Sequence, residues 1–227
     1  MRHRFNQKLK ELRDDILKMG SMVEDELTLA MKALDSLDLE MAQQVYAADV
    51  EVNDMRFAIE EKCFGLIVTQ QPAASDLRAI VAVMNMIVDL ERMGDQAKGI
   101  AKIIERMVEY SKRPNLPELA KMGEIVGEML HQSMTAYANN DINLAQLVAD
   151  RDDEVDGLYA NIFTQAMEKM ADTKKQKKVE ASYPEELTGG TLHIIAKQLS
   201  PLSSTDLPIK DNVLKHLSNK TIILVEV

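Results

Sequence analysis

Acidic side chains lie at positions where a helical repeat would turn them away from water. Glu91 and Asp95 stand one turn apart and continue an apolar stripe that runs through residues 77, 81, 84 and 88. This pattern predicts that both carboxylates point toward the interior of a helix bundle. A buried carboxylate without a partner is costly, so it pairs with a cation, takes up a proton or binds a metal ion.

The same arrangement recurs in two other segments. Asp49 lies in an apolar stripe with Asn53 one turn further along, and Asp152 lies in a similar stripe with Asp156 one turn on. The Asp49 segment and the Glu91 segment are expected on neighbouring helices, so that their oxygens could form one site. The predicted metal ligands are Asp49, Asn53, Glu91, Asp95, Asp152 and Asp156.

Oxygen ligands restrict the metal that such a site would hold. They suit magnesium, calcium, manganese or iron better than a structural zinc. We expect iron or another divalent cation, with magnesium, manganese and zinc among the candidates. A structural alternative stays open, in which Arg92 neutralises a neighbouring acid. A di-iron centre would need two Glu-x-x-His elements, and only Glu128 to His131 matches; this histidine is therefore expected at the surface.

Five helical segments are predicted to position these residues, because apolar residues recur in each at steps of three and four. Gln71-Pro72 ends one segment, since the residue before a proline avoids helical backbone. Residues 113–117 form a proline-rich linker, and Asn139-Asn140 forms a turn. The segments are residues 5–37, 39–68, 76–111, 117–139 and 141–172.

An internal repeat appears when the sequence is compared with itself at an offset of 103 positions. Ten identities fall within residues 31 to 59. The matching pairs are Met31/Met134, Ala33/Ala136, Asp38/Asp141, Ala42/Ala145, Gln43/Gln146, Val45/Val148, Asp49/Asp152, Glu51/Glu154, Val52/Val155 and Ile59/Ile162. The predicted fold is all-α, with two tandem three-helix bundles in domains 1–112 and 117–227. Residues 183–227 lose the helical periodicity, so the sixth helix of this plan is not recognisable there.

The composition excludes several classes of function. The 227-residue chain carries a net charge of −10, which disfavours nucleic-acid binding. Its apolar stretches are too short for a transmembrane helix of about 20 residues. Cys63 lies on an apolar stripe and is expected in the core rather than as a nucleophile. No nucleophile is paired with a base, so an enzyme is not predicted. The alternative function is a metal-storage or di-iron-type oxidase bundle.

Three runs in the chain match one known family in order and spacing. They are Asp49-x-Glu51-Val52-Asn53, the run QQPAASDLR at residues 70–78, and the run DLERMGD at residues 89–95. In these runs the sequence resembles the PhoU family, the accessory proteins of phosphate-specific transport. The resemblance covers residues 5 to about 182, and Asp152-x-Glu154-Val155-Asp156 is similar to the second-copy motif.

The resemblance implies a function. PhoU proteins are tandem three-helix bundles with E/D-x-x-x-D metal motifs. They are cytoplasmic negative regulators of the phosphate regulon that link the ATPase of the phosphate importer (PstB) to a sensor histidine kinase (PhoR). A homodimer and membrane recruitment through these partners are further expectations. The family's sixth helix carries an E-R-x-x-D signature that residues 183–227 lack. Divergence or a reading-frame shift near residue 183 would explain this.

Overall fold

The computed structural model of the chain describes residues 2–109 and 117–176, and all but a few turn residues among them are helical. The helices are α1 (Arg2–Ser36), α2 (Leu39–Gln70), α3 (Ala74–Glu109), α4 (Pro117–Asn139), α5 (Ile142–Asp150) and α6 (Asp152–Gln176). The all-α prediction is confirmed. One expected element differs, because the segment predicted as a single helix over 141–172 is divided at Arg151.

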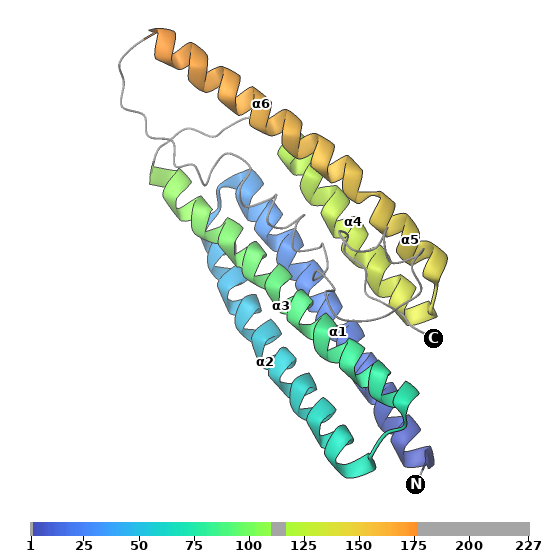
Figure 1. Cartoon of the computed structure of the whole chain (residues 1–227). Helices are drawn as coiled ribbons and strands as arrows, with labels where there is room; N and C mark the ends of the chain where they lie inside the picture. The colour runs from blue at the N-terminus through green and yellow to red at the C-terminus, as the bar shows by residue number, and fades with distance from the viewer. Residues whose placement is uncertain (1, 110–116, 177–227) are drawn as a thin grey trace.

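The first three helices form an antiparallel bundle (Figure 1). They have 35, 32 and 36 residues, so each is about 50 Å long at a rise of about 1.5 Å per residue. Each helix turns one apolar stripe inward. The most deeply buried side chains include Leu12, Ile16, Met19, Ile59, Ile80, Ile87, Leu90, Ile100 and Ile104.

The two copies of the repeat begin their second helix in the same way. Asp38 accepts hydrogen bonds from the backbone N–H groups of Glu40 and Met41, and Asp141 accepts one from that of Leu144. Side-chain oxygens at this position satisfy N–H groups that the helix leaves unpaired. The residue before each cap has a positive φ, of 54° at Leu37 and 52° at Asn140. The repeat read from the sequence is therefore also a repeat of backbone geometry.

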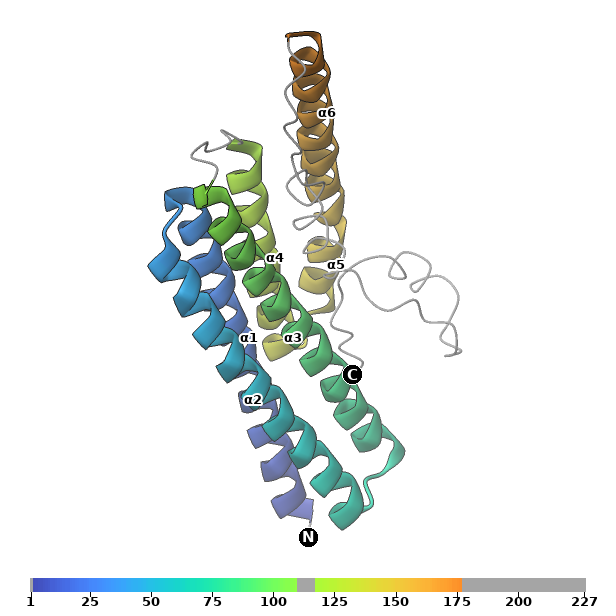
Figure 2. The same cartoon turned by 90° about the vertical axis from the view of Figure 1, so that its left-hand side faces the viewer.

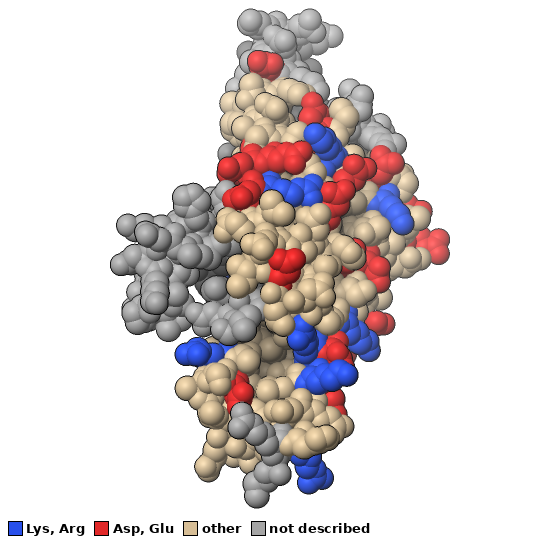
Figure 3. Space-filling view, turned by 90° about the vertical axis from the view of Figure 1, so that its right-hand side faces the viewer, with Lys and Arg blue, Asp and Glu red and all other residues tan. Residues whose placement is uncertain are grey.

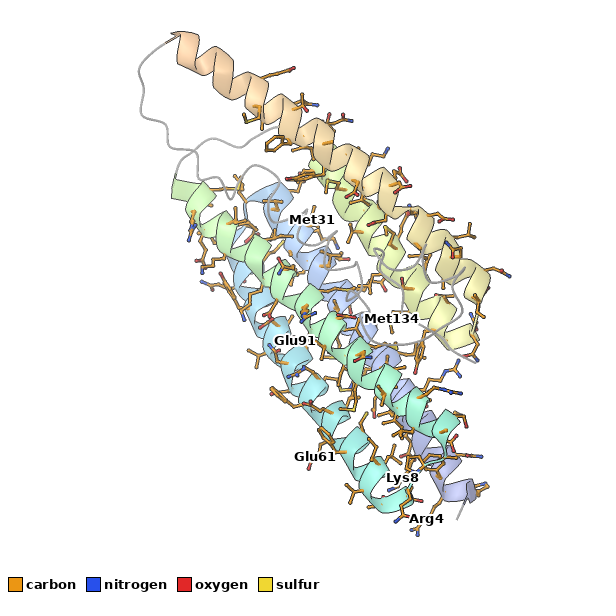
Figure 4. All side chains as sticks on the ribbon, in the orientation of Figure 1. Arg4, Lys8, Met31, Glu61, Glu91 and Met134 are labelled. Carbon is orange, nitrogen blue, oxygen red and sulfur yellow. The ribbon has the colours of Figure 1, made fainter. Side chains whose placement is uncertain are left out.

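Helix α4 packs against α1 in a reciprocal contact. A β-carbon at Gly20 of α1 would lie 2.5 Å from Cε of Met134, and one at Gly123 of α4 would collide with Met31. Each methionine and each glycine has its counterpart 103 positions away, so the two repeats meet about a local two-fold axis. Figure 4 shows Met31 and Met134 between the two helices. Only glycine leaves room for the methionine side chains at this distance.

Arg13 adds a polar contact to the same interface. Its guanidinium donates hydrogen bonds to the carbonyl oxygens of Tyr137, at 3.1 Å, and of Ala138. It also lies over the Tyr137 ring, 5.6 Å from the centroid. The last carbonyls of a helix have no partner within the helix, so a cation placed there stabilises its C-terminus. Helix α1 thus holds the end of α4 from outside.

The second copy is described as far as α6. Arg151, between α5 and α6, donates to Oε2 of Glu128 on α4 at 2.8 Å and to Oε1 of Gln132 at 3.3 Å. Helix α6 then starts with three acidic residues, which suit the positive end of its dipole. The contacts of Arg151 with α4 and the acidic first turn of α6 together explain why the helix is divided at Arg151. The counterpart of α3, the predicted tail 183–227 and hence the extent of the second domain lie outside the described residues.

Candidate functional site

Asp49 is buried within the first bundle, as predicted. It is 1% exposed and lies on the inward face of α2 between Val45 and Val52. Its Oδ2 accepts a hydrogen bond from Nδ2 of Asn53 at 3.1 Å and one from Nζ of Lys98 at 2.6 Å. The stripe predicted for α2 is the buried one, and Asp49 lies in it as expected.

The prediction that Glu91 and Asp95 both point inward is wrong for Asp95. Glu91 is only half-buried, and the Asp95 side chain is 49% exposed. Leu77 and Val81, at the start of the same stripe, are 38% and 44% exposed. Helix α3 instead buries the neighbouring stripe, which consists of Ile80, Val83, Ile87, Leu90, Ala97 and Ile104. That stripe contains no charge over the whole helix, which is the feature that decides which face is buried.

Lys98 forms ion pairs with two carboxylates of this site. Its Nζ lies 2.6 Å from Oδ2 of Asp49 and 3.9 Å from Oδ1 of Asp95. The hydrogen bond with Asp49 raises the pKa of Lys98 above its ordinary value, against the opposing effect of burial. Because it comes from α3 while Asp49 comes from α2, the pair joins two helices. Lys98 was not predicted, since spacing along one helix carries no information about a partner on another helix.

Glu26 of α1 is the second functional candidate that the sequence analysis missed. It is 1% exposed, and neither carboxylate oxygen has a hydrogen-bond partner among the described residues. A β-carbon at Gly94 would lie 2.9 Å from its Oε2, so glycine provides the space for this carboxylate. Burial, reinforced by the charge of Asp49 and opposed by that of Lys98, raises the pKa of Glu26 to about 8.

Glu26, Asp49, Asp95 and Lys98 are called the carboxylate cluster below. The charges of Asp49, Asp95 and Lys98 each shift the pKa of Glu26. The four residues come from all three helices of the first bundle. At neutral pH the cluster is best described as a protonated Glu26 beside an Asp49–Lys98 ion pair. A pattern signal for Glu26 does exist, because it lies at helical spacing with the buried Val23 and Ala30.

The predicted metal ligands stay a prediction, and the described residues show only how their side chains are grouped. Along residues 2–109 and 117–176, no three histidine, cysteine, aspartate or glutamate side chains are grouped closely enough to hold one. Beside Asp49, the Lys98 ammonium already supplies a positive charge at 2.6 Å from Oδ2. The structural alternative at Arg92 is present in part, since its Nη1 lies 3.6 Å from Oδ1 of Asp89.

The second repeat places its predicted pair at the start of α6. Asp152 is 8% exposed, whereas Asp156 is exposed to solvent. The two residues therefore do not point into one enclosed site.

Two other sequence candidates have the structural roles that we expected. The His131 side chain is 66% exposed, with Nδ1 3.2 Å from Oε2 of Glu24. Cys63 is fully buried in the core, and burial raises the pKa of its thiol to about 11. A thiol that holds its proton so firmly is a poor nucleophile.

Comparison with known proteins decides the family. The PhoU domain model matches residues 16–104 and again 119–194. The chain belongs to the PhoU family. It is 38% identical over 173 residues to a phosphate-specific transport system accessory protein PhoU homolog of Clostridium acetobutylicum, which covers 76% of this chain and 79% of that protein. It is 34% identical to the PhoU protein of Escherichia coli K12 over 75% of this chain and 71% of that one.

Solved PhoU structures have the same architecture. The crystal structure of PhoU from Pseudomonas aeruginosa superposes with a TM-score of 0.78 at 30% identity, covering 86% of this chain and 92% of that one. The phosphate transport system regulatory protein PhoU from Streptococcus pneumoniae gives a TM-score of 0.74 at 29% identity, over 86% and 90% of the two chains. The resemblance found in the motif runs is thereby confirmed over most of the chain.

Proposed function

We propose that this PhoU-family chain is a regulatory accessory protein of a phosphate-specific transport system. The observation that carries the proposal is the 38% identity to an accessory protein of that system over 79% of the relative's length. The TM-score of 0.78 to a solved PhoU structure supports it, because the likeness extends over 86% of this chain and is not confined to a motif.

The finer proposal is that the chain is a cytoplasmic adaptor that acts by protein contact. It links the transporter ATPase (PstB) to the sensor histidine kinase (PhoR), restrains phosphate uptake and represses the phosphate regulon when phosphate is plentiful. Its net charge of −10 disfavours direct action on DNA. Across residues 2–109 and 117–176, no helix is long and apolar enough to cross a bilayer. Contact with membrane proteins would then come from its folded surface.

The metal-binding role stays a prediction and forms no part of this mechanism. The cluster around Lys98 supports a structural role instead, because an ion pair already links α2 to α3 there. Elemental analysis of the parent and of a Glu91→Ala, Asp95→Ala double variant tests the metal prediction. A lower metal content in the variant would support it, and an equal content would reject these two ligands.

The adaptor proposal is tested by recruitment to membranes. Membranes are prepared from cells with both partners, with the transporter ATPase alone, with the kinase alone, and with neither. We expect the chain in the membrane fraction only when at least one partner is present. Equal recovery from cells lacking both, or nanomolar binding to a phosphate-starvation promoter at physiological salt, would contradict the proposal.

A further inference from the structure

The outer face of α2 carries apolar side chains that no described helix covers. Val50, Phe57, Phe64 and Val68 are 57%, 58%, 51% and 77% exposed. They follow one another at steps of seven, seven and four residues, so they lie along one line of the helix. Helix α2 borders α1 and α3, and its free side faces away from α4 to α6 (Figures 1 and 2). Single exposed apolar residues are ordinary, but an aligned row of them indicates an interaction surface.

Two carboxylates stand within this row. In a heptad whose d positions are residues 50, 57 and 64, the a positions are Asp54, Glu61 and Val68. Figure 4 shows Glu61 on the outer side of α2. These six residues are called the α2 seam below. They present the a and d pattern of a coiled-coil interface, with acidic groups at two of the three a positions.

The carboxylates of the α2 seam have no counter-ion within the described part of the chain. The two neighbouring cations are engaged elsewhere. Lys62 pairs with Asp15 at 2.5 Å, and Arg56 lies 4.0 Å from Glu60 and over the Phe57 ring at 4.9 Å from its centroid. Asp54 and Glu61 are therefore available to a cation on another molecule.

The repeat does not require the aromatic residues of the α2 seam. At an offset of 103, Phe57 and Phe64 correspond to Ala160 and Met167, while Asp49, Val52 and Ile59 on the inward face have identical counterparts. The inward face is thus the part that the shared fold uses. The aromatic side chains at these two outward positions are therefore specific to the first repeat, although Met167, the counterpart of Phe64, is also apolar and exposed.

We propose that the α2 seam binds a basic amphipathic helix of a partner protein. Apolar side chains of that helix would pack against Val50, Phe57 and Phe64, and lysine or arginine would lie opposite Asp54 and Glu61. Opposite charges would set the register and speed the encounter. This inference rests on the proposed function, which requires partner contacts, and it deepens that function by naming the surface and the chemistry of the partner.

The charges of the α2 seam disfavour binding of a second copy of this chain or of an anionic membrane. In a parallel pair with a second copy, Asp54 would face Asp54 and Glu61 would face Glu61. In an antiparallel pair, each carboxylate would be buried against the apolar d positions without a cation. An anionic bilayer would be repelled by both carboxylates. A basic helix alone satisfies the apolar and the acidic parts of the α2 seam together.

A peptide probe tests the surface on the full chain. Two fluorescent helical peptides of about three heptads carry leucine at the positions that face Val50, Phe57 and Phe64; opposite Asp54 and Glu61, one peptide has lysine and the other has glutamate. We expect the parent to bind the lysine peptide and not the glutamate peptide. Phe57→Ser with Phe64→Ser, and separately Asp54→Lys with Glu61→Lys, should each weaken binding about tenfold or more. Phe163→Ser, at an exposed site on α6 (43% exposed), is the matched control and should bind like the parent.

Purified transporter ATPase and the cytoplasmic part of the sensor kinase test whether the α2 seam serves the proposed function. We expect both double variants to lose binding to at least one of them, while Phe163→Ser keeps it. If the parent binds neither protein, the proposed function fails. The peptide experiment still decides whether the α2 seam binds a basic helix. Equal peptide binding by parent and double variants would overturn the inference. The inference would also be overturned if the parent chain forms a dimer, or binds phosphatidylglycerol vesicles, and the Phe57→Ser, Phe64→Ser variant loses that association.

Discussion

At Glu26 a carboxylate stands where the second repeat has Met129, and the two side chains are 1% and 2% exposed. The same core position is thus apolar in one copy and ionisable in the other. Asp49 was predictable from its stripe on α2, and Glu26 could have been found in the same way on α1. Lys98 could not, because its pairing with Asp49 depends on how α3 is rotated against α2.

Replacing Glu26 by methionine is expected to stabilise the protein, most strongly at alkaline pH. The pKa of Glu26 is about 8 in the folded chain against an ordinary 4.5. The folded state therefore binds more protons than the unfolded state between these values, and the contribution of Glu26 to stability falls as the pH rises through this range. Above pH 8 the variant should gain on the order of 3 kcal/mol. Urea denaturation between pH 5 and pH 9 measures this, with the exposed Glu51→Gln as control; equal pH slopes for parent and Glu26→Met would contradict it.

Removing the Lys98 ammonium should destabilise the first bundle. Lys98→Met leaves Asp49 buried without a cation, and we expect a loss on the order of 2 kcal/mol, since Lys98 is 40% exposed and solvent screens part of the interaction. Asp49→Asn in the same chain should recover most of the loss. Chemical denaturation of the single and double variants, with Lys102→Met as an exposed control, measures the effect. A loss no larger than that of the control would argue against a structural ion pair.

At the scale of helices, the sequence was sufficient where charges interrupt the competing apolar row and insufficient where two apolar stripes lie side by side. Helix α2 was oriented correctly, since its outer row of Val50, Phe57, Phe64 and Val68 is interrupted by Asp54 and Glu61. Helix α3 has two adjacent stripes, and the one that leads to Glu91 and Asp95 is the more exposed. The break at Arg151 could not be predicted, since it depends on contacts with Glu128 and Gln132 of another helix.

The reciprocal contact between α1 and α4 should make Gly20 intolerant of a side chain. Alanine favours a helix over glycine by about 1 kcal/mol, but its β-carbon would lie 2.5 Å from Met134. We expect Gly20→Ala to lower the free energy of unfolding by about 1–3 kcal/mol. Gly127→Ala, where a β-carbon would meet nothing within 4 Å, should raise it instead. Equal gains in both variants, measured by urea denaturation, would show that α1 and α4 do not meet as described.

At the scale of the whole molecule, charge limits what the chain can approach. The face in Figure 3 carries acidic side chains mainly in its upper half, and basic ones are more numerous near its lower end. With a net charge of −10, association with an acidic polymer is disfavoured, while a basic protein surface is attracted. Membrane recruitment of the chain by its partners should therefore weaken as salt rises from 50 to about 300 mM. Recovery that does not change with salt would show that these contacts are not charge-steered.

The central claim, that the chain represses the phosphate-starvation response, is tested most directly by a promoter reporter. A phosphate-starvation promoter is fused to a fluorescent protein in a strain of the source organism that lacks this chain. In phosphate-rich medium we predict high fluorescence in that strain and repression to the starting level when the parent chain is restored. Low fluorescence without the chain, or unchanged high fluorescence after its restoration at normal abundance, would contradict the account.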